Sequence, residues 1–279
     1  MPPYLTELAK AMRAVGAVNI SDYVLDARGQ RNASTDDPVQ AGFLNTPLIV
    51  EETQADQRYY AAKNRGIPKR IDSHLTIFDC ITCDKCIPVC PNDANFAYHT
   101  GEVELTYHDV EVAADGSVQE IGDEQVFRLE RQEQIANFAD YCNHCGNCDT
   151  FCPEYDGPYL KKPSFFGSRQ AFDEGAPHDG FYLEGRHGDL ELTGRINSQV
   201  YRLRQLAQSS GYQYFDGAVT LAVSRSGEIA LDPTTALPPT PHGIDMGRFH
   251  AMATLLTGIT DSNRIHAINA PLLAEQSKD

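Results

Sequence analysis

The sequence contains no tryptophan and few basic residues. Its 279 residues include 23 Lys and Arg against 39 Asp and Glu, which gives a formal net charge of −16. This charge excludes non-specific binding to nucleic acid and to anionic membranes, since both need a basic surface. No apolar run approaches the roughly 20 residues of a membrane-spanning helix. The start of the chain lacks the unbroken apolar segment of a secretory signal. We therefore expect a soluble, cytoplasmic protein without membrane insertion.

Sequence fingerprints of common catalytic sites are missing as well. The chain has no G-x-G-x-x-G, no Walker A loop, no H-E-x-x-H and no G-x-S-x-G. His108–Asp109 and His178–Asp179 resemble acid–base pairs only because they are adjacent, and neighbouring side chains on a strand point to opposite faces. The chain therefore shows no nucleotide or flavin fingerprint of its own, and we assign no catalytic residues.

Eight cysteines are present, and all fall into two runs with the same spacing. The runs DCITCDKCIPVCPN and YCNHCGNCDTFCPE both read C-x2-C-x2-C-x3-C-P. Adding 62 to each number of the first set, Cys80, Cys83, Cys86 and Cys90, gives the second set, Cys142, Cys145, Cys148 and Cys152. An internal repeat made of cysteines indicates a repeated metal site.

This spacing is typical of bacterial ferredoxins with two clusters. Three thiolates of each run bind one cubane, and the fourth reaches across to the other cubane. We therefore expect two [4Fe–4S] clusters. The first has the ligands Cys80, Cys83, Cys86 and Cys152, and the second has the ligands Cys142, Cys145, Cys148 and Cys90.

Other uses of these cysteines fit the pattern less well. A disulfide framework would need an oxidising compartment and usually a short secreted chain. Structural zinc usually takes widely separated C-x2-C pairs. His144 lies inside the second run, but four cysteines already complete a cluster's ligand set, so we expect this histidine either beside the ligands or at the surface. Acidic residues such as Asp84 and Asp149 flank the ligands, and their charge would lower the reduction potential.

The rest of the sequence predicts an α+β fold around a bacterial ferredoxin-like core that holds two [4Fe–4S] clusters. Residues 1–70 are expected to form a helical N-terminal extension, with a charged helix over residues 51–65. Residues 71–170 form the ferredoxin-like domain. A β-hairpin over residues 100–130 is inserted in it, because residues 102–112 alternate and Asp115-Gly116 is a turn signal.

Helical patterns are predicted on both sides of the second cysteine run. Residues 132–141 are expected to form a helix that leads into this run. Residues 171–279 form a mixed α/β C-terminal extension with an amphipathic helix over 195–210 and a final helix over 243–259. The tail after this helix is expected to be loose. We interpret the extension as a docking surface whose deletion after about residue 233 leaves the clusters intact.

The cysteine runs also carry a family resemblance. The stretch FDCITCDKCIPVCPNDANF, followed by QIANFADYCNHCGNCDTFCPEYDGPYLKKPSFFGS, closely resembles the C-terminal iron–sulfur region of a family described as selenate reductases. These are bacterial flavoproteins akin to dihydropyrimidine dehydrogenase and to the small subunit of glutamate synthase. The preceding NTPLIVEETQADQRYYAAKNRGIPKRI is similar to the lead-in of that region, so the resemblance covers residues 45–185.

The resemblance implies an electron relay. In such proteins an FAD module that oxidises NAD(P)H passes electrons through [4Fe–4S] clusters to a second redox centre, often an FMN. This chain would be a non-catalytic electron-transfer subunit of a multi-subunit oxidoreductase. Its partners would be flavoprotein subunits that bind FAD and NAD(P) or FMN. Two alternatives are a free low-potential ferredoxin-type carrier, whose negative charge suits basic partners, and a catalytic reductase subunit.

Overall fold

The computed structural model describes Ala14, residues 38–57, Tyr60, Ala62, and residues 70–186, 189–205, 211–224 and 226–272. The chain divides into two units, Met1–Ile67 and Pro68–Asp279. Helix α3 (Pro38–Ala55) belongs to the first unit and begins well before the helix predicted over residues 51–65. Most of the predicted N-terminal extension, residues 1–70, lies outside the described residues.

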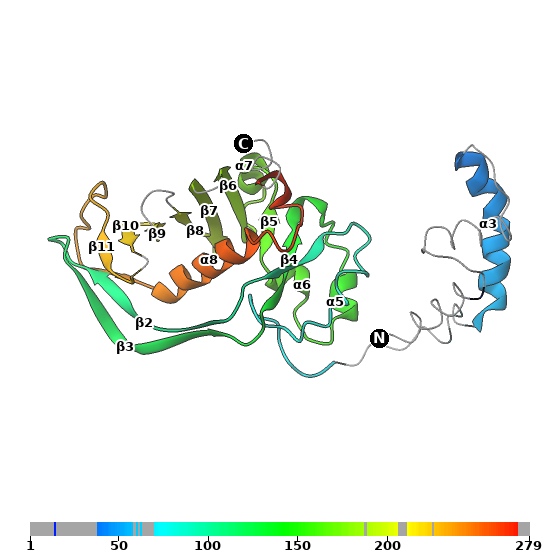
Figure 1. Cartoon of the computed structure of the whole chain (residues 1–279), viewed down its shortest axis with the longest axis horizontal. Coiled ribbons are helices and arrows are strands. Elements are labelled where there is room, and N and C mark those ends of the chain that lie inside the picture. Colours follow the sequence, from blue (N-terminus) through cyan, green and yellow to red (C-terminus); the bar gives the residue numbers. More distant parts are fainter. Residues whose placement is uncertain are drawn as a thin grey trace. The chain divides into compact units, whose positions relative to one another are not determined.

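A nine-stranded sheet forms the main layer of the second unit (Figure 1). Strand β5 pairs in parallel with both of its neighbours, and the other pairs are antiparallel. The sheet spans both sides of residue 170, where the sequence predicts a domain boundary. Its strands, in spatial order, are β1 (Asn95–His99), β4 (Glu133–Phe138), β5 (Ser164–Phe166), β6 (Gly180–Arg186), β7 (Asp189–Ile196), β8 (Gln199–Gln205), β9 (Tyr212–Phe215), β10 (Thr220–Val223) and β11 (Ile229–Leu231).

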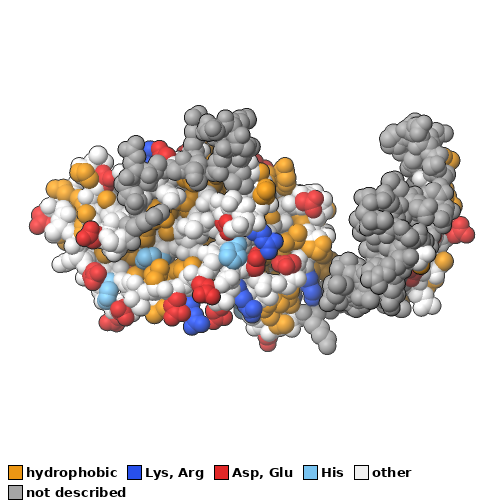
Figure 2. All heavy atoms as spheres, viewed as in Figure 1, with side chains coloured by type: hydrophobic (Ala, Val, Ile, Leu, Met, Phe, Trp, Pro, Cys, Tyr) orange, Lys and Arg blue, Asp and Glu red, His pale blue; other side chains and the backbone are white. Residues whose placement is uncertain are grey.

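A long β-hairpin extends from the side of this sheet. Strands β2 (Val103–Val112) and β3 (Val118–Leu129) pair in antiparallel register, which confirms the strands that alternation predicts here. Gly116 has a φ of 86° in the connecting turn, a value that favours glycine. The short strand β12 (His242–Ile244) pairs with β2 and completes a three-stranded sheet. Figure 2 shows acidic side chains along this hairpin.

Helix α8 (Met246–Ile259) packs against strands of both sheets and confirms the final helix predicted from the sequence. The Asp245 carboxylate caps it by accepting the Arg248 N–H at 3.1 Å. Figure 1 shows the helix lying between the hairpin and the large sheet. Its buried side chains are Met246, Phe249, Met252, Leu255, Leu256 and Ile259, which belong to the main hydrophobic core. The C-terminal segment is therefore part of the core, and its deletion would remove more than a docking surface.

The first residues after α8 are held in place, although the sequence predicts a loose tail there; residues 273–279 lie outside the described residues. The Asn269 side chain donates to the carbonyl oxygens of Asp261 and Arg264, at 3.1 and 2.7 Å. Its amide oxygen accepts the His266 N–H at 2.9 Å. Buried polar contacts therefore fix this turn against the core.

Two predicted helices are strands in the structure. The helix expected over residues 132–141 is β4 followed by the 3-10 turn η2 (Ala139–Tyr141), and four consecutive residues of β4 are buried. A strand buried on both faces has no alternation, so its pattern cannot be told from that of a helix. The described part of the helix expected over residues 195–210 is the end of β7, a turn and β8, and residues 206–210 lie outside the described residues. Asn197 and Ser198 adopt positive φ values of 52° and 65°, which make a hairpin turn.

Short helices connect the strands around the cysteine runs. Helix α5 (Asn147–Phe151) carries Cys148 and ends at Cys152. Helix α6 (Pro158–Lys161) precedes β5, and α7 (Arg169–Glu174) follows it. Among the described residues, no helix is both long and apolar enough to cross a bilayer.

Candidate iron–sulfur site

The eight cysteines surround two small cavities. The first is lined by Cys80, Cys83, Cys86 and Cys152, together with other residues. The second is lined by Cys142, Cys145, Cys148 and Cys90. In each cavity three cysteines come from one run and the fourth comes from the other. These are the two sets of four that the sequence predicts as cluster ligands.

The sequence repeat is also a repeat of backbone conformation. Thr82 and His144, related by the offset of 62, have φ values of 48° and 55°. Asp84 and Gly146, related in the same way, have φ values of 56° and 77°. Left-handed φ values are uncommon for residues other than glycine and are kept only where the surroundings impose them. The paired values show that both loops turn in the same manner around their cysteines.

The ends of the two loops repeat as well. The Cys90 N–H donates to the carbonyl oxygen of Ile87 at 3.2 Å, and the Cys152 N–H donates to that of Asp149 at 3.2 Å. The donor and the acceptor of the second bond each lie 62 residues after those of the first. Each bond closes a turn just before the proline that follows the run. The turn directs the fourth cysteine away from the loop that holds the other three.

Several thiols are buried and protonated when nothing is bound. Burial, together with the nearby thiols of Cys80, Cys148, Cys83 and Cys152, raises the pKa of Cys86 to about 12. Burial also raises the pKa of Cys80, Cys148 and Cys152. Cys83 and Cys145 are exposed, and all eight thiols are free of disulfide bonds. A metal cluster binds thiolates, so its insertion must release these protons.

Donors to sulfur are present in the first loop and just beyond it. The Thr82 N–H donates to Cys80 Sγ at 3.4 Å, and the Ala94 N–H donates to Cys90 Sγ at 3.3 Å. Hydrogen bonds to sulfur stabilise the thiolate and shift the reduction potential of a bound cluster. In the part of the chain that the structure describes, no three His, Cys, Asp or Glu side chains are placed around a single ion. A cubane binds each thiolate through a different iron, so its ligands do not converge on one point.

Buried amide side chains of β1 and β4 hold the first cysteine loop. Asn95 donates to the Cys86 carbonyl oxygen at 2.9 Å, and Asn137 on the neighbouring strand donates to Asn95 Oδ1 at 3.0 Å. Gln134 accepts the Asp79 N–H at 2.8 Å and donates to the Asp79 carboxylate at 3.0 Å. Sequence reasoning missed these three amides. The available signal is polar residues inside otherwise apolar strands, which must find a partner when buried.

The approach segment before the first run is tied to the end of the second run. Arg70 donates to the carbonyl oxygens of Cys152 and Glu154 at 2.9 and 2.5 Å. The Ile71 N–H donates to the Pro153 carbonyl oxygen at 2.8 Å. These bonds fix the backbone at Cys152 and at the two residues after it. Cys152 is the cysteine that crosses to the first cavity.

The two cavities differ in charge. The first is also lined by Glu154 and Lys162, which are both buried. Lys162 donates to the Phe78 carbonyl oxygen at 3.1 Å, and burial lowers the pKa of its ammonium group. Glu154 accepts the Ile81 N–H at 3.2 Å. The second cavity is lined by the uncharged side chains of Asn95, Asn137 and Tyr159 besides its cysteines. Such differences give two bound clusters different reduction potentials.

The histidines singled out in the sequence are not among the residues that line the two cysteine cavities. His144 lines a separate, larger cavity, and its ring lies 5.6 Å from that of Tyr159 and 6.1 Å from that of His178, between centroids. Asp109 accepts hydrogen bonds from Met246 and Gln125, and Asp179 accepts from the turn at Asn197. These carboxylates therefore serve structural contacts.

Comparison with known proteins agrees with this site. The family model of the 4Fe-4S dicluster domain matches residues 76–155, a stretch that includes all eight cysteines. No curated protein and no solved structure matches the chain. Residues 76–155 are thus a ferredoxin-like iron–sulfur region that binds [4Fe–4S] and serves in electron transfer. The resemblance to the selenate reductase family stays a prediction.

Proposed function

We propose that the chain holds two [4Fe–4S] clusters, one in each cysteine cavity, and relays electrons as a subunit of a larger oxidoreductase. The observation that carries the proposal is the exchanged fourth cysteine, since Cys152 lines the first cavity and Cys90 lines the second. Four thiols per cavity are the full ligand set of a cubane. A bound cluster takes up and releases one electron, while the chain holds it in place and sets its potential.

The same proposal includes the fold of the region. The two cysteine loops with strands β1 and β4 form a ferredoxin-like core, and the β2–β3 hairpin is inserted between its halves. The antiparallel pairing of β1 with β4 supports this interpretation, because each strand lies next to one cysteine run in the sequence.

The proposed partners are a flavoprotein that oxidises NAD(P)H and a second redox protein. Exposed side chains beside the cysteine loops support docking on this side of the unit. Cys83 and Cys145 are exposed, and large exposed apolar side chains lie nearby in sequence: Ile81, Tyr141, Phe151, Tyr155 and Leu160. Exposed apolar side chains close in sequence to the cluster ligands suit a partner that must come close for electron transfer.

The test of the clusters is a set of double substitutions in the full chain, purified without oxygen. The wild-type protein should contain about eight iron atoms and eight sulfides. Cys80→Ser with Cys152→Ser removes two ligands of one proposed cluster, so about four iron atoms should remain. Cys80→Ser with Cys90→Ser removes one ligand of each cluster and should lower the iron content further. The reverse order, with more iron retained in the variant that combines Cys80→Ser with Cys90→Ser, would refute the exchanged ligand sets.

The test of the relay is purification of the tagged chain from its native host. A flavin-binding chain that co-purifies in a fixed ratio is the expected result. Recovery of the iron–sulfur protein alone, without flavin, would instead favour a free carrier.

A further inference from the structure

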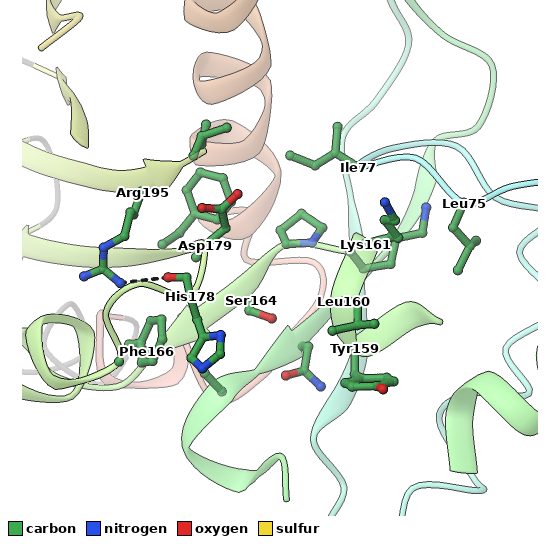
Figure 3. A pocket seen from close by; sticks show the side chains of 18 of the residues that line it. Leu75, Ile77, Tyr159, Leu160, Lys161, Ser164, Phe166, His178, Asp179 and Arg195 are labelled. Carbon is green, nitrogen blue, oxygen red and sulfur yellow. Dashed lines mark hydrogen bonds between the residues drawn. The ribbon is translucent and has the colours of Figure 1, made fainter. Parts of the chain in front are cut away.

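Figure 3 shows a further cavity, which has a volume of about 620 Å³. It shares Asn137 and Tyr159 with the second cysteine cavity, and Leu75 and Lys162 with the first. Its size is in the range of sites that hold small organic molecules. A molecule bound here would touch the walls of both proposed cluster sites.

The lining of this cavity is basic, in contrast to the chain as a whole. Lys161, Lys162 and Arg195 line it, together with the imidazoles of His144 and His178. Asp179 is the only carboxylate among the lining residues that the structure describes, and it accepts the backbone N–H groups of Asn197 and Ser198, at 2.9 and 3.5 Å. A basic lining in a chain of net charge −16 indicates an anionic ligand.

Apolar and aromatic side chains form the remaining walls. Figure 3 shows Ile77, Tyr159, Leu160 and Phe166 around the cavity, with Lys161 beside them. Phe181 and Ile196 also line it. Aromatic walls suit a planar ring, because flat surfaces bury large areas against each other.

The histidine side of the cavity is held in place by a buried cation. Arg195 donates to the carbonyl oxygen of His178 at 2.8 Å and to that of Phe172 at 2.5 Å. Its guanidinium also lies 4.2 Å from the centroid of the Phe172 ring. The loop that carries His178 and Asp179 is therefore fixed by the core, as expected of a largely pre-formed binding site.

We propose that this cavity binds a small planar aromatic anion, a ring system that bears a phosphate or carboxylate group. The ring lies between Tyr159, Leu160 and Phe166, and the anionic group faces Lys161. The inference rests on the proposed function only for the ligand's use, which is electron exchange with the neighbouring clusters. The binding itself is independent of that use.

The test introduces a fluorescent reporter into the wall of the cavity. The chain has no tryptophan, and Leu160 is 62% exposed, so Leu160→Trp adds a single fluorophore at little structural cost. Leu237→Trp is the matched control, because Leu237 is 54% exposed and does not line the cavity. The full chain is titrated with flavin mononucleotide, the probe, without oxygen. Saturable quenching in Leu160→Trp alone is expected, and equal quenching in both variants would overturn the proposal.

The anionic part is tested separately. In the Leu160→Trp background, Lys161→Gln should weaken binding of flavin mononucleotide about tenfold, since a hydrogen bond to a charged group is lost. Lys85→Gln, which removes an exposed lysine outside the cavity, should leave it unchanged. Riboflavin, which has the ring without the phosphate, should bind about tenfold more weakly. Equal affinity for both flavins would overturn the anionic assignment. Iron content of the same samples separates failed cluster assembly from failed binding.

Discussion

His266 makes the stability of the protein depend on pH in a way that can be calculated. Its imidazole is 9% exposed and stacks on Phe96 of β1, with a centroid distance of 4.5 Å. Neither ring nitrogen has a hydrogen-bond partner in the described structure. Burial therefore lowers the pKa of His266 from 6.5 to about 4, because the charged form loses its water without gaining a partner.

The sign and size of the effect follow from linkage. The folded protein favours neutral His266, so this stability is fully present above pH 6.5 and is lost as the pH falls towards about 4. A shift from 6.5 to about 4 corresponds to a total of about 3 kcal/mol. Between about pH 7.5 and pH 5 the expected loss is about 2 kcal/mol.

The assay is urea unfolding of wild type, His266→Phe and His266→Gln at several pH values in this range. Both variants remove the titrating group, and phenylalanine keeps an aromatic ring beside Phe96. The unfolding free energy of wild type should fall by about 2 kcal/mol more than that of either variant. If wild type and both variants lose the same free energy, the buried imidazole does not control the pH dependence and the reasoning fails.

Three further outcomes are expected. Deletion of the residues after 233 should abolish the folded unit as well as cluster binding, since it removes the buried side chains of α8; native-like circular dichroism with full iron content would contradict this. Arg70→Gln should lower iron retention at the first cavity more than Lys85→Gln does, because Arg70 holds the backbone beside Cys152; iron release to a chelator measures it. Asp84→Asn should raise the midpoint potential of one cluster by on the order of tens of millivolts, since it removes a negative charge from the lining of the first cavity, and a redox titration without such a rise would contradict the effect.

The site was largely predictable from the sequence because its chemistry depends on spacing. The repeat of C-x2-C-x2-C-x3-C-P places the cysteines through local loop geometry, and the structure groups them around two cavities. The groups that support the loops were not predictable. Gln134 and Asn95 act through contacts from strands β4 and β1 to the first cysteine loop. Lys162 contacts Phe78, which lies 84 positions earlier in the sequence. Such pairings are set by the fold and leave no local signal.

The fold was predictable only where a sequence pattern is compatible with a single type of secondary structure. Alternation and the Asp115-Gly116 turn indicated the hairpin, and the apolar spacing indicated helix α8. Strand β4 was wrongly predicted as a helix because it is buried on both faces, so its apolar residues have no period of two. The helix prediction that begins at residue 195 was wrong because the turn at Asn197-Ser198 lacks the glycine that usually marks a tight hairpin.

The crossing of Cys90 and Cys152 between the two cavities also has a consequence for synthesis. On the ribosome the first run emerges 62 residues ahead of the second, and three of its thiols then face a site without a fourth ligand. The first site becomes complete only when Cys152 has been made, whereas the second has all four thiols once Cys148 has emerged. The site whose first cysteines are made earliest would therefore receive its cluster last. A cluster in this site would show that the chain has been translated beyond both runs. Nascent chains arrested before Cys152 should accordingly carry at most one stable cluster, and iron counts on such chains can test this order.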